Sequence, residues 1–173
     1  DEAVIRPYLE RVRDFPVLIL DIRGNSGGSD TYWSEFLLPA IVDRPYEMKT
    51  YYAVKEGELF RKMLRQQGMQ EIRRDDSDYE ALPEVTKELL APFSHWAKSP
   101  LRVEPAADSI RYAGRLYLLV DEGVYSSSEM LAAFAKETGL ATLVGTRTGG
   151  DGIGDVHRLD QRDRTEHADV GIT

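Results

Sequence analysis

The chain has 173 residues, of which 42% are hydrophobic and 30% are charged, a balance that fits one soluble globular domain with its own core. A net charge of −8 argues against a surface that follows nucleic-acid phosphates, so we expect no nucleic-acid partner. The lack of cysteine excludes disulfides, thiolate metal ligands and a cysteine nucleophile. No apolar run approaches the roughly 20 residues that cross a bilayer. The abrupt ends at Asp1 and Thr173 suggest a fragment of a longer protein.

The first quarter of the chain carries two helical patterns around one strand. Apolar residues recur at helical spacing over residues 2–14 and again over 30–42, so both segments are predicted helices. Residues 17–22 form a continuous apolar run, which is typical of a strand buried on both faces of a parallel sheet. A glycine-rich loop, residues 23–28, follows this strand.

Residues 43–110 are polar, rich in charge and interrupted by prolines. Helices are predicted at 58–67 and 80–90, so we interpret this stretch as a helical insertion packed on the core of the same domain. A lid over a binding crevice is the alternative to a plain surface decoration.

Continuous apolar runs and helical spacing, as in the first quarter, return in the last third of the chain. Residues 115–120 and 140–144 are predicted strands, and residues 126–138 between them are a predicted helix with Gly139 at its C-terminal cap. A glycine-rich loop occupies 145–154, and a further strand is predicted at 169–173.

Alternation of strands and helices predicts an α/β fold with βαβ units and a parallel sheet. In such sheets the loops beyond the carboxyl ends of the strands form the binding crevice. Three loops rich in glycine or serine should therefore meet at one edge.

The serine cluster Tyr125-Ser126-Ser127-Ser128-Glu129 permits two interpretations. Ser126 and Glu129 match a capping box, which is a common helix start. A serine at a sharp turn before a helix is also well placed as a nucleophile, because the N–H of Ser127 is free to stabilise an oxyanion. An N–H of the loop that follows Asp21 would be a second donor. That loop also fits a tight turn or an anion nest.

Motifs for other chemistry are missing. Neither the G-x-G-x-x-G fingerprint nor the Walker pattern is present, and Asp151 and Asp155 lack the spacing of a calcium loop. We therefore expect no cofactor and no metal.

Three segments together resemble peptidase family S41, the class of C-terminal processing or tail-specific proteases. The segments lie on predicted strand-to-loop edges, occur in the family's order and cover roughly residues 16–40 and 115–154. They are Leu18–Gly28 (LILDIRGNSGG), Val120–Glu129 (VDEGVYSSSE) and Leu143–Gly152 (LVGTRTGGDG).

The resemblance implies a ClpP/crotonase-like core and a serine peptidase, a hydrolase acting on peptide or protein substrates. It selects Ser126 as the nucleophile, because the family's serine stands three residues before the glutamate. It places the oxyanion donors on Ser127 and on a glycine of the first loop, either Gly27 or Gly28. It also favours an extracytoplasmic or secreted location.

One position departs from the tail-specific branch, which carries its basic lysine in a Gly-Lys-Gly sequence. Here Asp151 stands between Gly150 and Gly152, and an acid cannot act as a neutral amine base. The tricorn-like branch, which uses a histidine, fits better. His95 lies among apolar residues and is expected to be a packing or surface residue, whereas His157 and His167 are in the polar tail. We therefore expect the base to come from outside this chain.

Two other functions remain open at this point. The acid at position 151 would suit a peptide-binding relative that has lost catalysis. A crotonase-like acyl hydrolase would also build an oxyanion hole from loop N–H groups.

Overall fold

The computed structural model of the protein describes most of the chain in two compact units. The described residues are 2–55, 57–82, 84–150 and 170–172. We call the units the core unit (Asp1–Met48 and Leu101–Gly152) and the insertion unit (Lys49–Pro100 and Ile153–Thr173). The prediction that all 173 residues form a single domain stays a prediction.

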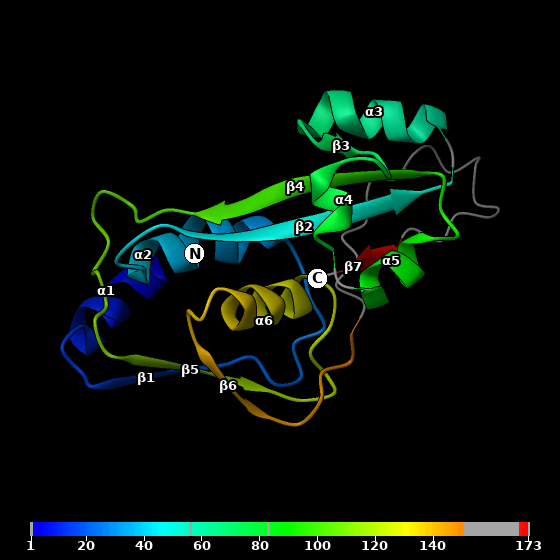
Figure 1. The fold of residues 1–173 in the computed structure, drawn as a ribbon. Helices are drawn as coiled ribbons and strands as arrows, with labels where there is room; N and C mark the ends of the chain where they lie inside the picture. The colour runs from blue at the N-terminus through cyan, green and yellow to red at the C-terminus, as the bar shows by residue number, and fades with distance from the viewer. Residues whose placement is uncertain (1, 56, 83, 151–169, 173) are drawn as a thin grey trace. The chain divides into compact units, whose positions relative to one another are not determined.

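A three-stranded parallel sheet forms the base of the core unit, as predicted (Figure 1). Its order is β1 (Val17–Asp21), β5 (Arg115–Val120) and β6 (Thr142–Gly145). Leu20 of β1 is opposite Leu118 of β5, which in turn is opposite Leu143 of β6. All three strands therefore end at the same edge, where the loops that follow them meet.

Four helical segments belong to the core unit. They are α1 (Glu2–Val12), η1 (Tyr32–Leu37), α2 (Leu38–Ile41) and α6 (Ser127–Glu137). The single helix predicted over 30–42 is one turn of π-helix followed by a short α-helix. The helix predicted from residue 126 begins one residue later, at Ser127.

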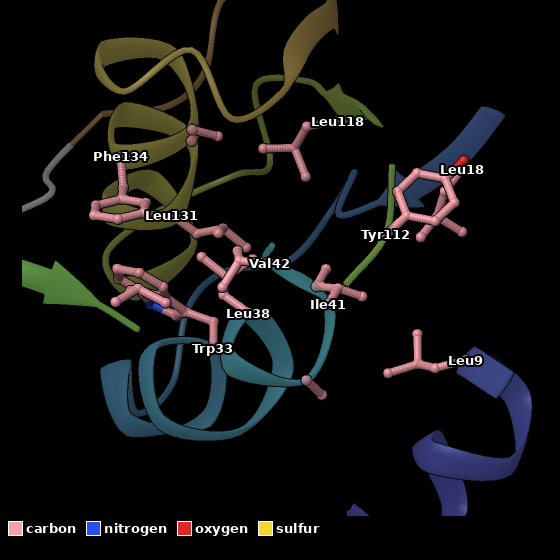
Figure 2. Packing of buried hydrophobic residues seen from close by; sticks show 14 of the residues in the cluster. Leu9, Leu18, Trp33, Leu38, Ile41, Val42, Tyr112, Leu118, Leu131 and Phe134 are labelled. Carbon is pink, nitrogen blue, oxygen red and sulfur yellow. The ribbon is translucent and has the colours of Figure 1, made fainter. Parts of the chain in front are cut away.

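Aromatic and aliphatic side chains fix α6 against η1 and the sheet. Phe134 is fully buried, and its ring centroid lies 5.5 Å from that of Trp33, with the planes tilted by 47° (Figure 2). Leu118 from β5 and Leu131 from α6 belong to the same buried cluster. This packing holds α6 next to the segment that contains Trp33.

The sheet is not buried on both faces within the described residues. Leu18 is 5% exposed, but its neighbour Ile19 is 55% exposed and Val144 is 45% exposed. The prediction that β1 is buried on both faces is therefore wrong for this chain. Leu18 packs in the buried cluster that includes α6, whereas Ile19 lies on the opposite, exposed face of the sheet.

A second sheet contains strands that the sequence did not reveal. Its order is β3 (Gln70–Ile72), β4 (His95–Val103), β2 (Tyr46–Val54) and β7 (Val170–Ile172). The helices of the insertion unit are α3 (Gly57–Gln67), α4 (Ser77–Glu80) and α5 (Glu84–Leu90). Helices are present as predicted, although two short helices, α4 and α5, replace the one predicted at 80–90. Strand β7 lies within the strand predicted at 169–173.

The insertion unit has its own buried clusters. Trp96 is 6% exposed and its indole N–H donates to the carbonyl of Leu90 over 2.9 Å, which ties β4 to the end of α5. None of the described helices is long and apolar enough to cross a membrane.

Replacing Phe134 with alanine should destabilise the core unit strongly. Loss of a fully buried phenyl ring costs about 3–5 kcal/mol in the free energy of unfolding. Phe15 is 58% exposed, so Phe15→Ala is the matched control and should cost no more than about 0.5 kcal/mol. Urea unfolding followed by tryptophan fluorescence measures both, and equal effects would contradict this description of the core.

Candidate active site

Ser126 lies at the turn between β5 and α6 and has an uncommon backbone conformation. Its φ is +53° and its ψ is −123°, in a region that residues other than glycine rarely adopt. Such a conformation costs about 1–3 kcal/mol and persists where surrounding structure holds it. It matches the strained strand-to-helix turn that presents a nucleophilic serine in other hydrolases.

The capping interpretation of Ser126 is not supported by the structure. Its side chain makes no capping hydrogen bond to α6. The carboxyl group of Glu129 instead accepts a hydrogen bond from the hydroxyl of Thr148 over 2.9 Å. The two residues therefore do not form the reciprocal pair of a capping box.

Asp121 joins the loop after β1 to the loop after β5. Its Oδ1 accepts the backbone N–H of Gly24 over 2.8 Å and that of Gly123 over 3.0 Å. A second link is the N–H of Tyr125, which donates to the carbonyl of Asn25 over 3.1 Å. The first and second predicted loops are thus held together beside Ser126.

Gly27 lies so close to Ser126 and its chain neighbours that a side chain does not fit. A methyl group at Gly27 would lie 2.8 Å from Cβ of Ser126 and 3.2 Å from the nitrogen of Ser127. Its φ of +110° also requires glycine. This position of the first loop depends on Asn25, whose Oδ1 accepts the N–H of Gly27 over 3.0 Å.

The backbone donors near Ser126 differ in their availability. The N–H of Gly27 is occupied by Asn25, whereas the N–H groups of Gly28 and Ser127 donate to none of the residues that the structure describes. Ser127 is the first residue of α6, and helix-start N–H groups have no partner within the helix. Gly28 and Ser127 both line a cavity of about 190 Å³ beside this turn.

Apolar side chains also line this cavity. Trp33, Leu37 and Leu131 contribute to it, and Figure 2 labels Trp33 and Leu131 on the two facing helices. The indole N–H of Trp33 donates to Oγ of Ser127 over 3.2 Å. Trp33 therefore both packs in the core and lines the pocket. Phe36, which belongs to the same predicted helix over 30–42, is 47% exposed and does not line this cavity.

The third predicted loop runs along the second. The N–H of Gly149 donates to the carbonyl of Val124 over 2.9 Å, and Gly150 pairs in parallel with Tyr125, the residue before Ser126. The structure thus brings together all three loops that the sequence analysis predicted to meet. Asp151, His157 and His167 lie outside the described residues.

The described part of the core unit holds no histidine or lysine near Ser126 that could act as its general base. It contains no histidine, and its one lysine, Lys136, is ten residues after Ser126, about 15 Å along α6. His95 belongs to the insertion unit, where its ring stacks on Phe60 at 5.0 Å. That His95 is a packing or surface residue stays a prediction. No group of acidic or histidine side chains suited to a metal ion occurs among the described residues.

Comparison with known proteins identifies the family. The model of peptidase family S41 matches residues 2–164, so the chain belongs to peptidase family S41. No curated protein sequence matches the chain.

Two solved structures share the fold. The photosystem II D1 C-terminal processing protease is 20% identical over 87% of this chain and 27% of its own, with a TM-score of 0.50. Mature CPAF is 17% identical over 86% of this chain and 33% of its own, with a TM-score of 0.56. The chain therefore spans about a third or less of these proteins.

An exposed ion pair at the end of β1 braces the entry to the first loop. Hydrogen bonds from the side chain and the backbone of Arg23 hold the pKa of Asp21 at about 2, below its ordinary value of 3.8. Because the pKa is lowered in the folded state, this contribution to stability is present above pH about 4 and is lost as the pH falls towards 2.

Arg23→Gln should raise the pKa of Asp21 towards its ordinary value near 4. Carbon NMR of the Asp21 carboxyl group as a function of pH measures the shift. Arg13→Gln is the control, because Arg13 pairs with Glu10 and should leave Asp21 unchanged. A titration of Asp21 near pH 4 in the unmodified protein would show that the ion pair does not form.

Proposed function

We propose that this chain carries the nucleophile of a serine peptidase, and that the nucleophile is Ser126. In the proposed reaction, Oγ of Ser126 attacks the carbonyl carbon of a peptide bond while its proton moves to a general base. The carbonyl oxygen becomes an oxyanion. The base then gives the proton to the departing amine, and water hydrolyses the acyl-enzyme by the same steps.

The backbone of Ser126 is the observation that carries this proposal. A serine with φ of +53° at the start of α6 is strained and makes no capping hydrogen bond. A structural role would not require this strain, because a capping serine takes an ordinary extended conformation. A nucleophile benefits from it, because the sharp turn presents Oγ to the substrate.

We infer that the N–H groups of Ser127 and Gly28 form the oxyanion hole. The sequence left Gly27 and Gly28 as alternatives. The hydrogen bond from Gly27 to Asn25 favours Gly28, since a committed N–H is not available to an oxyanion. In this proposal Gly27 serves by its lack of a side chain, which allows the close approach to Ser126.

The general base is proposed to come from outside this chain. Within the described part of the core unit no histidine occurs, and Lys136 is too far along α6 to reach Ser126. A histidine base of the tricorn-like kind remains the proposal, because the lysine of the tail-specific branch is replaced by Asp151.

Peptide or protein chains are the proposed substrates, and removal of C-terminal segments is the proposed task. Membership of peptidase family S41 and the likeness to a C-terminal processing protease support both. The same findings favour neither a crotonase-like acyl hydrolase nor a relative that binds peptides without cleaving them.

A fluorophosphonate probe should label Ser126 in the full-length protein, because a strained serine with a base and an oxyanion hole attacks phosphorus readily. Mass spectrometry of peptides locates the adduct. Ser126→Ala should abolish labelling, and Ser128→Ala is the matched control that should retain it. Adduct on Ser127 or Ser128, or no labelling of a folded protein, would contradict the proposal.

Gly27→Ala should suppress labelling of Ser126 by at least tenfold, because the added methyl group displaces the turn and the oxyanion donors. Gly139→Ala is the control, since Gly139 also has positive φ (+67°) but has open space around it and caps the far end of α6. Gly139→Ala should lose about 1 kcal/mol of stability, and Gly27→Ala should lose more, because its methyl group also meets Ser126. Equal labelling of the two would show that the contact does not matter.

A further inference from the structure

The side chain of Ser127 is not used by the proposed oxyanion hole, which takes only the backbone N–H of this residue. Ser127 is 7% exposed and lines the cavity beside Ser126. Its Oγ accepts the indole N–H of Trp33 over 3.2 Å, from a residue 94 positions away in the chain. A buried hydroxyl group next to the nucleophile is thus held by a hydrogen bond from another element.

The direction of this hydrogen bond decides what the hydroxyl group of Ser127 can do. An indole N–H only donates, so Oγ of Ser127 is the acceptor and its own hydrogen points away from the indole. None of the residues that the structure describes accepts that hydrogen. A buried donor without an acceptor is unfavourable and rare in native proteins. The hydroxyl group therefore offers a hydrogen-bond donor to the cavity that Ser127 lines.

Trp33 is a rigid partner for this hydroxyl group. It is 3% exposed, and its ring packs against that of Phe134 at a centroid distance of 5.5 Å (Figure 2). Trp33 also belongs to the π-helical turn η1, and π-helical geometry is rare and frequent at functional sites. Because the indole is fixed, it restricts the directions in which the hydroxyl hydrogen of Ser127 can point.

The other residues that line the cavity define the side chain that fits it. Ile22, Leu37 and Leu131 contribute apolar contacts, and none of the described residues around the cavity is charged. Ser128 is 7% exposed and lines it as well, and its hydroxyl group has no partner among the described residues. The cavity of about 190 Å³ thus combines apolar contacts with one hydroxyl group that donates and another that is available to accept.

We propose that Trp33 orients the hydroxyl group of Ser127 as a hydrogen-bond donor to the substrate, so that the cavity selects a neutral side chain with an acceptor oxygen. The inference rests on the proposed function, which places the attacked carbonyl group against the N–H groups of Ser127 and Gly28. Both donors line this cavity, so it receives the side chain of the residue that carries that carbonyl group.

Threonine has the chemistry that this cavity requires. Its oxygen accepts the hydrogen bond from Ser127, its hydroxyl hydrogen is donated to Ser128, and its methyl group contacts the apolar side chains. Ser127 then determines specificity through its side chain, and Trp33 is a positioning residue that acts through Ser127.

Threonine and valine have the same shape and differ in the hydroxyl group, so a matched pair of substrates measures the hydrogen bond. We would use the full-length protein and two peptidyl p-nitrophenyl esters that end in threonine or valine and are otherwise identical. Release of p-nitrophenolate gives kcat/KM for each, and the unmodified protein should prefer the threonine ester. In Ser127→Ala the ratio of the two values should fall roughly three- to tenfold, because one neutral hydrogen bond is lost.

The ratio separates specificity from structural damage. Ser127→Ala keeps the backbone N–H of the oxyanion hole, and any loss of rate that is common to both esters cancels. Trp33→Phe keeps an aromatic ring against Phe134 but removes the indole N–H, so the ratio should fall here too, by a smaller factor. Ser34→Ala is the control, because Ser34 is next to Trp33 but its Oγ donates to the carbonyl of Asp30 and it does not line the cavity.

The outcomes distinguish the inference from the proposed function. If the folded protein hydrolyses neither ester faster than Ser126→Ala does, both fail. If it hydrolyses them but prefers valine, or if either Ser127→Ala or Trp33→Phe leaves the ratio unchanged, the inference alone is overturned. In that case the hydroxyl group of Ser127 serves only as the partner of a buried indole. Should Trp33→Phe not fold, Ser127→Ala decides the test by itself.

Discussion

The close approach of Gly27 to Ser126 is the contact on which the geometry of the site depends. There is room for a hydrogen atom but not for a methyl group, so the first loop lies directly against the turn before α6. Asn25 holds Gly27 in place, and Asp121 holds the two loops together. As a result, two backbone N–H groups from segments almost a hundred residues apart in the chain line the same cavity.

Strain at Ser126 is maintained by this arrangement. A residue with positive φ relaxes unless its neighbours prevent it. The parallel pairing of Tyr125 with Gly150 fixes the residue before Ser126, and the packing of Phe134 against Trp33 fixes the helix after it. Stability in the core and the backbone conformation of Ser126 are therefore linked through α6.

The sequence predicts the part of the fold that rests on local pattern. Continuous apolar runs predict β1, β5 and β6, and the parallel order of these strands places the glycine and serine loops after them at one edge. Strands β2 and β4 were missed, because they are polar, contain a proline in β4 and are defined by pairing with distant segments.

At the site itself, the sequence named Ser126, Ser127 and the glycine pair, but it could not choose between the glycines or exclude a helix cap. Both answers depend on hydrogen bonds that sequence spacing does not fix. Asn25 takes the N–H of Gly27, and Glu129 takes the hydroxyl of Thr148 rather than capping the helix. The hydrogen bond between Glu129 and Thr148 cannot be predicted from the sequence, because the two residues are nineteen positions apart on different elements.

A crystal structure of the full-length protein with a peptide boronic acid would show whether Ser126 is the nucleophile. We expect a covalent bond from Oγ of Ser126 to boron. One boronate oxygen should lie about 2.7–3.1 Å from the backbone nitrogens of both Ser127 and Gly28. A boronate attached to another residue, or an adduct on Ser126 whose oxygens contact neither nitrogen, would contradict it.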